Sequence, residues 1–252
     1  MRFVIPAVLA AVGLCAPNLA QDVLPVEGAL PFAEANRRAA LPRWLSLRYG
    51  EFDTAGPMPP IPAALSREPG AGEDYFVVQL RGPVTEPQKD ALRERGLAVL
   101  DYIPNHAFVV RGTTARVAAS RAADEIVWSS PMHPAWRVAP ELLRQPLEGR
   151  LTIVGFDGVP AATLVAQLTA AGATIDEQHA VDTRWLLVVR VDPQDLVAVA
   201  RCHDVQWVEP EGLVTQRNDL MVWTVQTGQQ GNTRIRRECL RGEGHTIGHL
   251  DG

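Results

Sequence analysis

The last residues of the sequence combine side chains that could take part in chemistry. The segment GEGHTIGHLDG, residues 242–252, has a glycine-rich turn, a short apolar strand and Asp251 at the tip of that strand. A carboxylate at the end of a strand can accept a hydrogen bond from an imidazole and hold it in one tautomer, which is how an aspartate supports nucleophilic catalysis. His245, His249 and Asp251 also alternate onto one face of the strand, a pattern that could bind a metal ion. Because the sequence has no second cluster of ligands, we predict no metal and no other cofactor.

The elements that would position such a site follow from an internal repeat in the middle of the chain. Thr85 and Gln88 fit a helix capping box, and Gly96 fits the end of that helix. The first copy, residues 75–140, has the element order βαββαβ, with strands in YFVVQL, LAVLDYI, HAFVVRG and EIVWSS and helices in TEPQKDALRERG and TTARVAASRAAD.

The second copy, residues 150–215, repeats the same order of elements. Leu164, Leu168 and Ala171 fall on one face of its first helix, and Gly172 ends that helix. Its strands lie in LTIVGF, ATIDEQHA, RWLLVVRV and VQWVEP, and its helices lie in PAATLVAQLTAAG and DPQDLVAVARCH. The repeat therefore predicts an α+β protein with two tandem ferredoxin-like domains. Each domain would place two helices on one face of a four-stranded antiparallel sheet and leave the other face to a partner or to water.

The amino-terminal part predicts secretion. Residues 1–20 combine Arg2, an apolar stretch and Ala20 at a cleavage position, so they read as a signal peptide. That stretch is shorter than the ~20 residues that span a bilayer, so we expect no stable membrane anchor. The protein is then secreted or periplasmic. Residues 21–74 are rich in proline and predict an irregular, loosely held leader.

Charge and cysteine content limit the partners and the redox state. The formal net charge of −5 and the pI near 5.7 give no support for a nucleic-acid partner, which requires a basic surface. Cys202 and Cys239 remain after removal of the signal. They either pair in an oxidising compartment or stay as two free thiols, with Cys202 buried on a helix face.

Several other side chains are interpreted as structural. His203 falls on the helix face of Leu196 and Val199 and is predicted to be a packing histidine. The basic segment RIRR, residues 234–237, is more typical of a solvated face than of a processing site. Four tryptophans are predicted to be core or interface residues: Trp128, Trp185, Trp207 and Trp223.

Two segments near the end of the chain resemble a known family. DVQWVEPEG, residues 204–212, resembles the end of the propeptide of subtilisin-like serine proteases, the subtilases, and residues 242–252 resemble the segment that opens their catalytic domain. The intervening residues are similar to the approach segment of a secreted bacterial branch of that family. The order of signal, leader, propeptide-like domains and catalytic strand matches as well. One departure is that Gly252 directly follows Asp251, where the family has threonine or serine and then glycine.

The resemblance implies a role for each part of the chain. Residues 216–252 would begin a truncated α/β catalytic domain, with Asp251 as the aspartate of its catalytic triad. The propeptide domains would assist folding and inhibit the protease, with the cognate catalytic domain as partner in cis and peptides as substrates of the full-length protein. We expect the second copy to be the inhibitory unit and the first to be a spacer or brace. Propeptide cleavage is expected between Gly212 and Thr233.

The remaining members of a triad are missing from the sequence. In subtilases the aspartate precedes the histidine and the serine, but no histidine follows Asp251. Loss of triad members costs on the order of 10⁶ in rate, so we expect this chain to be inactive alone and to be the amino-terminal part of a secreted serine endopeptidase precursor. The alternative is a complete secreted tandem ferredoxin-like binding or protease-inhibitor protein without catalytic activity. None of the available serines stands in a nucleophile motif: Ser46, Ser66, Ser120, Ser129 and Ser130.

Overall fold

The computed structural model of the chain describes residue 37 and residues 41–144, 149–212 and 227–238. These residues belong to two compact units, one that reaches to Glu211 and one that begins at Gly212. The predicted signal peptide lies outside the described residues. So do Asp251 and four other residues named above: Trp223, Cys239, His245 and His249.

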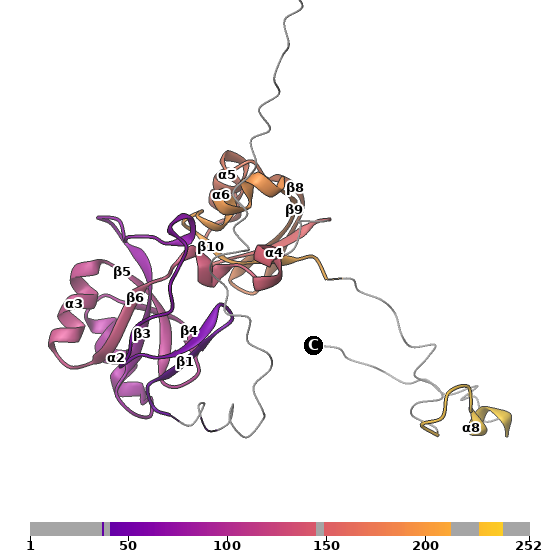
Figure 1. Cartoon of the computed structure of the whole chain (residues 1–252), viewed down its shortest axis with the longest axis horizontal. Helices are drawn as coiled ribbons and strands as arrows, with labels where there is room; N and C mark the ends of the chain where they lie inside the picture. Colours follow the sequence, from indigo (N-terminus) through magenta and orange to yellow (C-terminus); the bar gives the residue numbers. More distant parts are fainter. Residues whose placement is uncertain (1–36, 38–40, 145–148, 213–226, 239–252) are drawn as a thin grey trace, which may run out of the picture. The chain divides into compact units, whose positions relative to one another are not determined.

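The first copy of the repeat forms a four-stranded antiparallel sheet with the order β4-β5-β3-β6. Helices α2 and α3 lie together on one side of this sheet (Figure 1). The backbone N–H of Thr85 donates to Gln88 Oε1 at 2.9 Å, as the capping box predicts, and Gly96 ends the helix with a φ of 77°. The elements are β3 (Asp74–Leu80), α2 (Glu86–Glu94), β4 (Ala98–Ile103), β5 (Ala107–Gly112), α3 (Thr114–Ala122) and β6 (Ile126–Pro131).

The second copy forms another four-stranded antiparallel sheet, with the order β10-β7-β9-β8. Leu164 and Leu168 of α5 are fully buried, and Gly172 follows the helix with a φ of 94°. The elements are β7 (Leu151–Gly155), α5 (Ala161–Ala170), β8 (Thr174–Val181), β9 (Arg184–Arg190), η3 (Pro193–Asp195), α6 (Leu196–Ala200) and β10 (Val205–Pro210). The protein is thus a mixed α+β structure, and both strand orders are compatible with ferredoxin-like domains.

Both faces of the first sheet are covered. On one face, Phe76, Val78 and Leu80 of β3 pack in a cluster with α2 and α3. On the opposite face, Tyr75 and Val77 belong to a larger cluster that continues into the second copy. All seven residues of β3 are consequently buried.

The predicted irregular leader is wrong for residues 44–53 and 63–65, whereas residues 54–62 and 66–73 form neither helix nor strand. Residues 44–53 form a hairpin of β1 (Trp44–Leu47) and β2 (Gly50–Asp53), followed by the 3₁₀ turn η1 (Ala63–Leu65). Leu45, Phe52 and Leu65 are buried in the large cluster. Thr54 Oγ1 donates to Gln79 Oε1 at 2.6 Å, which ties the hairpin to β3. Pro42 precedes the hairpin and the other described prolines of the leader follow it, so none of them stands inside its two strands.

The chain passes from the first copy to the second through two short helices that the sequence did not predict. These are η2 (Pro134–Arg137) and α4 (Pro140–Arg144). Between them, the backbone N–H of Ala139 donates to the carbonyl of Val208 at 2.8 Å, and Val138 bridges to Val208 in parallel orientation. This contact places the connecting segment beside strand β10.

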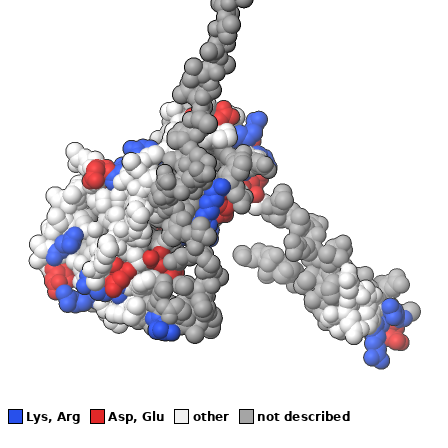
Figure 2. All heavy atoms as spheres, viewed as in Figure 1, with Lys and Arg blue, Asp and Glu red and all other residues white. Residues whose placement is uncertain are grey.

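The described residues of the second unit are Gly212 and residues 227–238. Its turn is held by Thr227 Oγ1, which donates to the carbonyl of Asn232 at 2.8 Å. The RIRR segment forms the single-turn helix α8 (Arg234–Arg237), in which Arg234 and Arg237 are exposed. On the face shown in Figure 2, basic and acidic side chains lie interspersed. Within the described ranges, no helix is both long and apolar enough to cross a bilayer.

Candidate functional site

One serine of the described chain contacts a histidine. Ser130 Oγ lies 3.2 Å from His133 Nε2, and both side chains are buried. The backbone N–H of Arg67 donates to His133 Nδ1 at 3.1 Å, so Nδ1 is the unprotonated nitrogen and Nε2 carries the proton. Burial lowers the pKa of His133 and favours this neutral form. The imidazole therefore donates to the serine and cannot accept its proton, which excludes this pair as a nucleophile and base.

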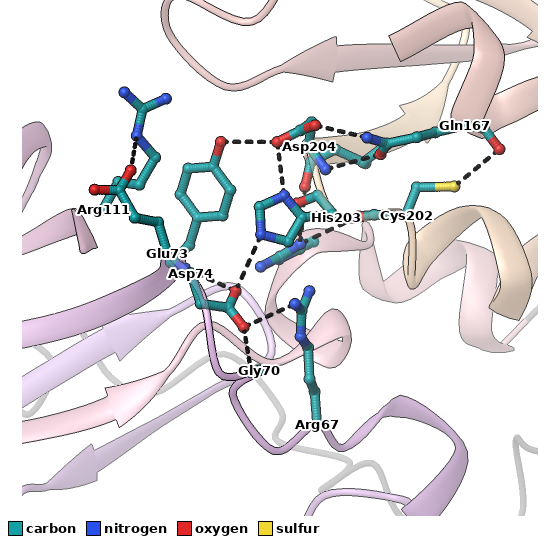
Figure 3. A network of polar contacts seen from close by, with 12 residues as sticks. Arg67, Gly70, Glu73, Asp74, Arg111, Gln167, Cys202, His203 and Asp204 are labelled. Atoms are coloured by element: carbon teal, nitrogen blue, oxygen red, sulfur yellow. Dashed lines mark hydrogen bonds and ion pairs between the residues drawn. The ribbon is translucent and has the colours of Figure 1, made fainter. Parts of the chain in front are cut away.

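A cluster of polar side chains lies where the two copies of the repeat meet, and we call it the seam network (Figure 3). It joins the start of β3 and the turn η2 to the loop between α6 and β10. Its members are Arg67, Asp74, Tyr75, Arg137, Gln167, Cys202, His203 and Asp204.

Asp204 collects hydrogen bonds from both copies of the repeat. His203 Nδ1 donates to Asp204 Oδ1 at 2.7 Å, and the Tyr75 hydroxyl donates to the same oxygen at 3.0 Å. Gln167 Nε2 donates to Asp204 Oδ2 at 2.6 Å. These donors, His203 foremost, outweigh the effect of burial and hold the pKa of Asp204 at about 2. Asp204 is therefore ionised at neutral pH.

His203 connects two carboxylates that come from different copies. Its Nε2 lies 3.5 Å from Asp74 Oδ1, while its Nδ1 contacts Asp204. Figure 3 shows the ring between the two carboxylates. Asp74 is almost fully buried, and Arg67 Nη2 donates to its Oδ2 at 2.7 Å. The predicted placement of His203 on the helix face of Leu196 and Val199 is wrong, because α6 ends at Ala200. The residue is nevertheless a satisfied packing histidine, since its ring contacts both carboxylates and lies against the Tyr75 ring.

Arg137 is the largest fully buried side chain of the described protein. Its Nη1 donates to the carbonyls of Cys202, His203 and Val205 at 3.3, 3.1 and 3.2 Å. Burial lowers the pKa of Arg137 to about 10, so the guanidinium still carries its charge at neutral pH. An arginine of the first copy thereby binds the backbone that leads into β10 of the second.

Aromatic rings complete the seam around Arg137. The rings of Tyr75 and Phe156 stack with centroids 3.6 Å apart and an interplanar angle of 10°. The Arg137 guanidinium carbon lies 5.7 Å from the Tyr75 centroid and 5.2 Å from that of Phe156, within cation–π range. Polar and apolar contacts therefore act on the same interface.

The seam network lacks an activated nucleophile. Burial raises the pKa of the Cys202 thiol to about 11, and burial together with Asp204 raises the pKa of the Tyr75 phenol. Cys202 is buried and forms no disulfide with a described residue, and Cys239, the other cysteine of the predicted alternatives, lies outside the described residues. In the described ranges no group of three or more His, Cys, Asp and Glu side chains could hold a metal ion. The arrangement is suited to joining the two copies rather than to catalysis.

The comparison with family models identifies one match, to a domain of unknown function (DUF8729), over residues 46–133. The matched stretch begins inside the β1–β2 hairpin and ends after β6. It therefore treats the hairpin and the first sheet as parts of one domain, in agreement with their packing. No curated protein matches the chain.

The low pKa of Asp204 predicts acid sensitivity of the folded protein. The group titrates near its ordinary value of about 3.9 when unfolded, so the unfolded chain binds the proton more tightly. The stability that Asp204 contributes is full above about pH 4 and is lost as the pH falls towards about 2. Urea unfolding at several pH values in this window should show a shallower pH dependence for Asp204→Asn than for the parent chain. If the free energy of unfolding of Asp204→Asn depended on pH as steeply as that of the parent chain, this assignment would be wrong. It would also be wrong if the exposed control Asp90→Asn flattened the pH dependence by the same amount.

Proposed function

We propose that this chain is the amino-terminal part of a secreted subtilisin-like serine endopeptidase precursor. In this proposal, the two copies of the repeat are tandem ferredoxin-like domains that assist folding of the catalytic domain and inhibit it. The order of the sequence segments supports the assignment, and so does the α+β architecture with its two antiparallel sheets. The catalytic domain in cis is the proposed partner, and Asp251 is its proposed triad aspartate.

The observation that carries the proposal is a difference between the two sheets. Strands β3 and β7 occupy the same central position in their sheets, but β3 is buried throughout, whereas buried and partly exposed residues alternate along β7. The hairpin and the second copy cover the first sheet. The second sheet retains exposure on its face opposite α5 and α6, which gives it the surface for a partner.

A row of side chains that is apolar on three of its four strands crosses this second face. Trp207 pairs with Val154, Val154 pairs with Leu186, and Leu186 pairs with His179, so one row crosses all four strands. Trp207, Val154 and Leu186 are each partly exposed. The neighbouring row is more polar and contains Glu209, Thr152, Val188 and Glu177. An apolar row with charged neighbours is the composition expected of a protein-binding face.

The chain leaves the second sheet from one of its edge strands. Strand β10 is an edge strand, and Glu211 directly follows it. Arg150 donates to both carboxylate oxygens of Glu211, at 2.7 and 2.6 Å, which fixes the direction of the chain there. A tail that leaves from this point could run as an extended strand along a protease cleft, which is recognition by strand addition. The second copy is therefore the proposed inhibitory unit, and the first copy is the proposed spacer or brace.

The proposal predicts inhibition by the full chain. Titrated into secreted subtilisin-like proteases, the parent chain should inhibit peptide hydrolysis and then be degraded slowly. Leu186→Asp should weaken this inhibition about tenfold or more, because it places a charge in the apolar row. Leu41→Asp, at an exposed position that precedes the β1–β2 hairpin, should inhibit like the parent.

Two results would count against this assignment. Equal loss of inhibition in Leu186→Asp and Leu41→Asp would show that the exposed face of the second sheet is not the docking surface. Failure of the folded parent chain to inhibit any protease of the panel would favour the alternative, a secreted binding protein made of two ferredoxin-like domains. Circular dichroism of each variant provides the check on folding.

A further inference from the structure

A hollow with a volume of about 410 Å³ opens in the first copy, at the end of β3 that is farther from the seam network. Its apolar floor includes Leu80 and Ile126, which are both buried. Four charged side chains line it: Arg43, Arg81, Arg121 and Asp124. The volume lies within the range of ~300 to 1,000 Å³ that is usual for pockets that bind small molecules.

The charged lining comes from three segments that are distant in the sequence. Arg43 directly precedes the β1–β2 hairpin, Arg81 directly follows β3, and Arg121 stands in the last turn of α3. Packing of the hairpin on the sheet is what adds Arg43 to the other two. The sequence alone gave no reason to place these arginines together.

The positive charge of this hollow is only partly neutralised. Arg81 Nη2 pairs with Asp124 Oδ1 at 2.6 Å. Arg121 Nη1 has a contact of 3.5 Å with Ser129 Oγ, which is uncharged. Arg43 forms no side-chain ion pair with the described residues. Arg43 and Arg121 thus line the hollow without an ion pair to a described carboxylate, so the hollow is locally positive in a chain of net negative charge.

We propose that this hollow binds a small multivalent oxyanion that carries carboxylate or phosphate groups. The planar fork of arginine matches both groups, because two parallel N–H donors can bind two oxygens at once. Arg43 and Arg121 are the principal ligands, while Arg81 remains paired with Asp124. This site shares no residue with the seam network or with the apolar row of the second sheet, so it does not depend on the proposed function.

Calorimetric titration of the full chain at low salt tests the site, with citrate and inorganic pyrophosphate as probes. Arg43→Gln and Arg121→Gln should each weaken binding roughly tenfold, because each removes a charge-assisted contact. Asp124→Asn should tighten binding, because it removes the negative charge at the site. Arg93→Gln, which alters an exposed arginine on α2, is the matched control and should bind like the parent.

The outcomes separate the sources of the anion and decide the proposal. Saturable binding of citrate alone assigns the site to carboxylates, and binding of pyrophosphate alone assigns it to phosphates; either supports the proposal. Absence of saturable binding by both probes overturns it. Equal weakening in Arg93→Gln and Arg43→Gln also overturns it, since the effect would then follow total charge and not the hollow.

Discussion

Arg137→Ala is expected to lower the free energy of unfolding by about 3 to 5 kcal/mol, because it leaves a large cavity and takes a donor away from buried carbonyls. The guanidinium is fully buried and supplies a donor to the carbonyls of Cys202, His203 and Val205. Its loss leaves three acceptors without that donor and removes a positive charge close to Asp204. Urea unfolding at neutral pH measures the effect.

Two further variants separate the contributions of Arg137. Arg137→Met restores most of the lost volume without the charge. The difference in the free energy of unfolding between the alanine and methionine variants therefore measures the cost of the cavity. Arg137→Lys keeps the positive charge but replaces the guanidinium, of which Nη1 donates to the three carbonyls while Nε and Nη2 have no hydrogen-bond partner among the described residues, by an ammonium group. The exposed Arg93→Ala should change stability by less than about 0.5 kcal/mol. A cost for Arg137→Ala as small as that of Arg93→Ala would show that the seam network does not stabilise the fold.

The periodic elements were predictable because local chemistry determines them. Each of the eight strands expected from the two copies is present, and Gly96 and Gly172 end their helices with positive φ. Thr85 and Gln88 form the expected capping interaction. Each of these signals involves residues that lie close together in the sequence, within one helical turn or one strand. They can therefore be recognised in a single sequence without knowledge of the tertiary structure.

The seam network was not predictable because its partners are far apart in the chain. Asp74 and His203 are brought together only when the two copies pack, and neither stands in a recognisable motif. The hairpin was missed for a related reason. Its strands have four residues each, and the proline-rich stretch that follows dominated the composition of the segment. Leu45 and Phe52 are buried by the sheet rather than by the hairpin itself, which no local pattern reports.

Phe156→Ala is expected to cost about 3 to 5 kcal/mol and to separate the unfolding of the two copies. Phe156 is fully buried in the second copy, and its ring stacks on Tyr75 of the first. Removal of the ring also takes away one of the two aromatic faces beside Arg137. Apolar and polar contacts across the seam therefore weaken together.

The matched control for Phe156 is Phe76→Ala. Phe76 is similarly buried, but it lies on the face of β3 that packs against α2 and α3, away from the seam. Its loss should also cost about 3 to 5 kcal/mol, while both copies still unfold in one transition. Hydrogen exchange followed by mass spectrometry measures the protection of each copy separately. In Phe156→Ala the two copies should differ in protection, whereas in Phe76→Ala they should fall together. Equal loss of protection in both copies of Phe156→Ala would mean that the stacked rings add stability without coupling the copies, and Arg137 with its carbonyl partners would then be the main connection between them.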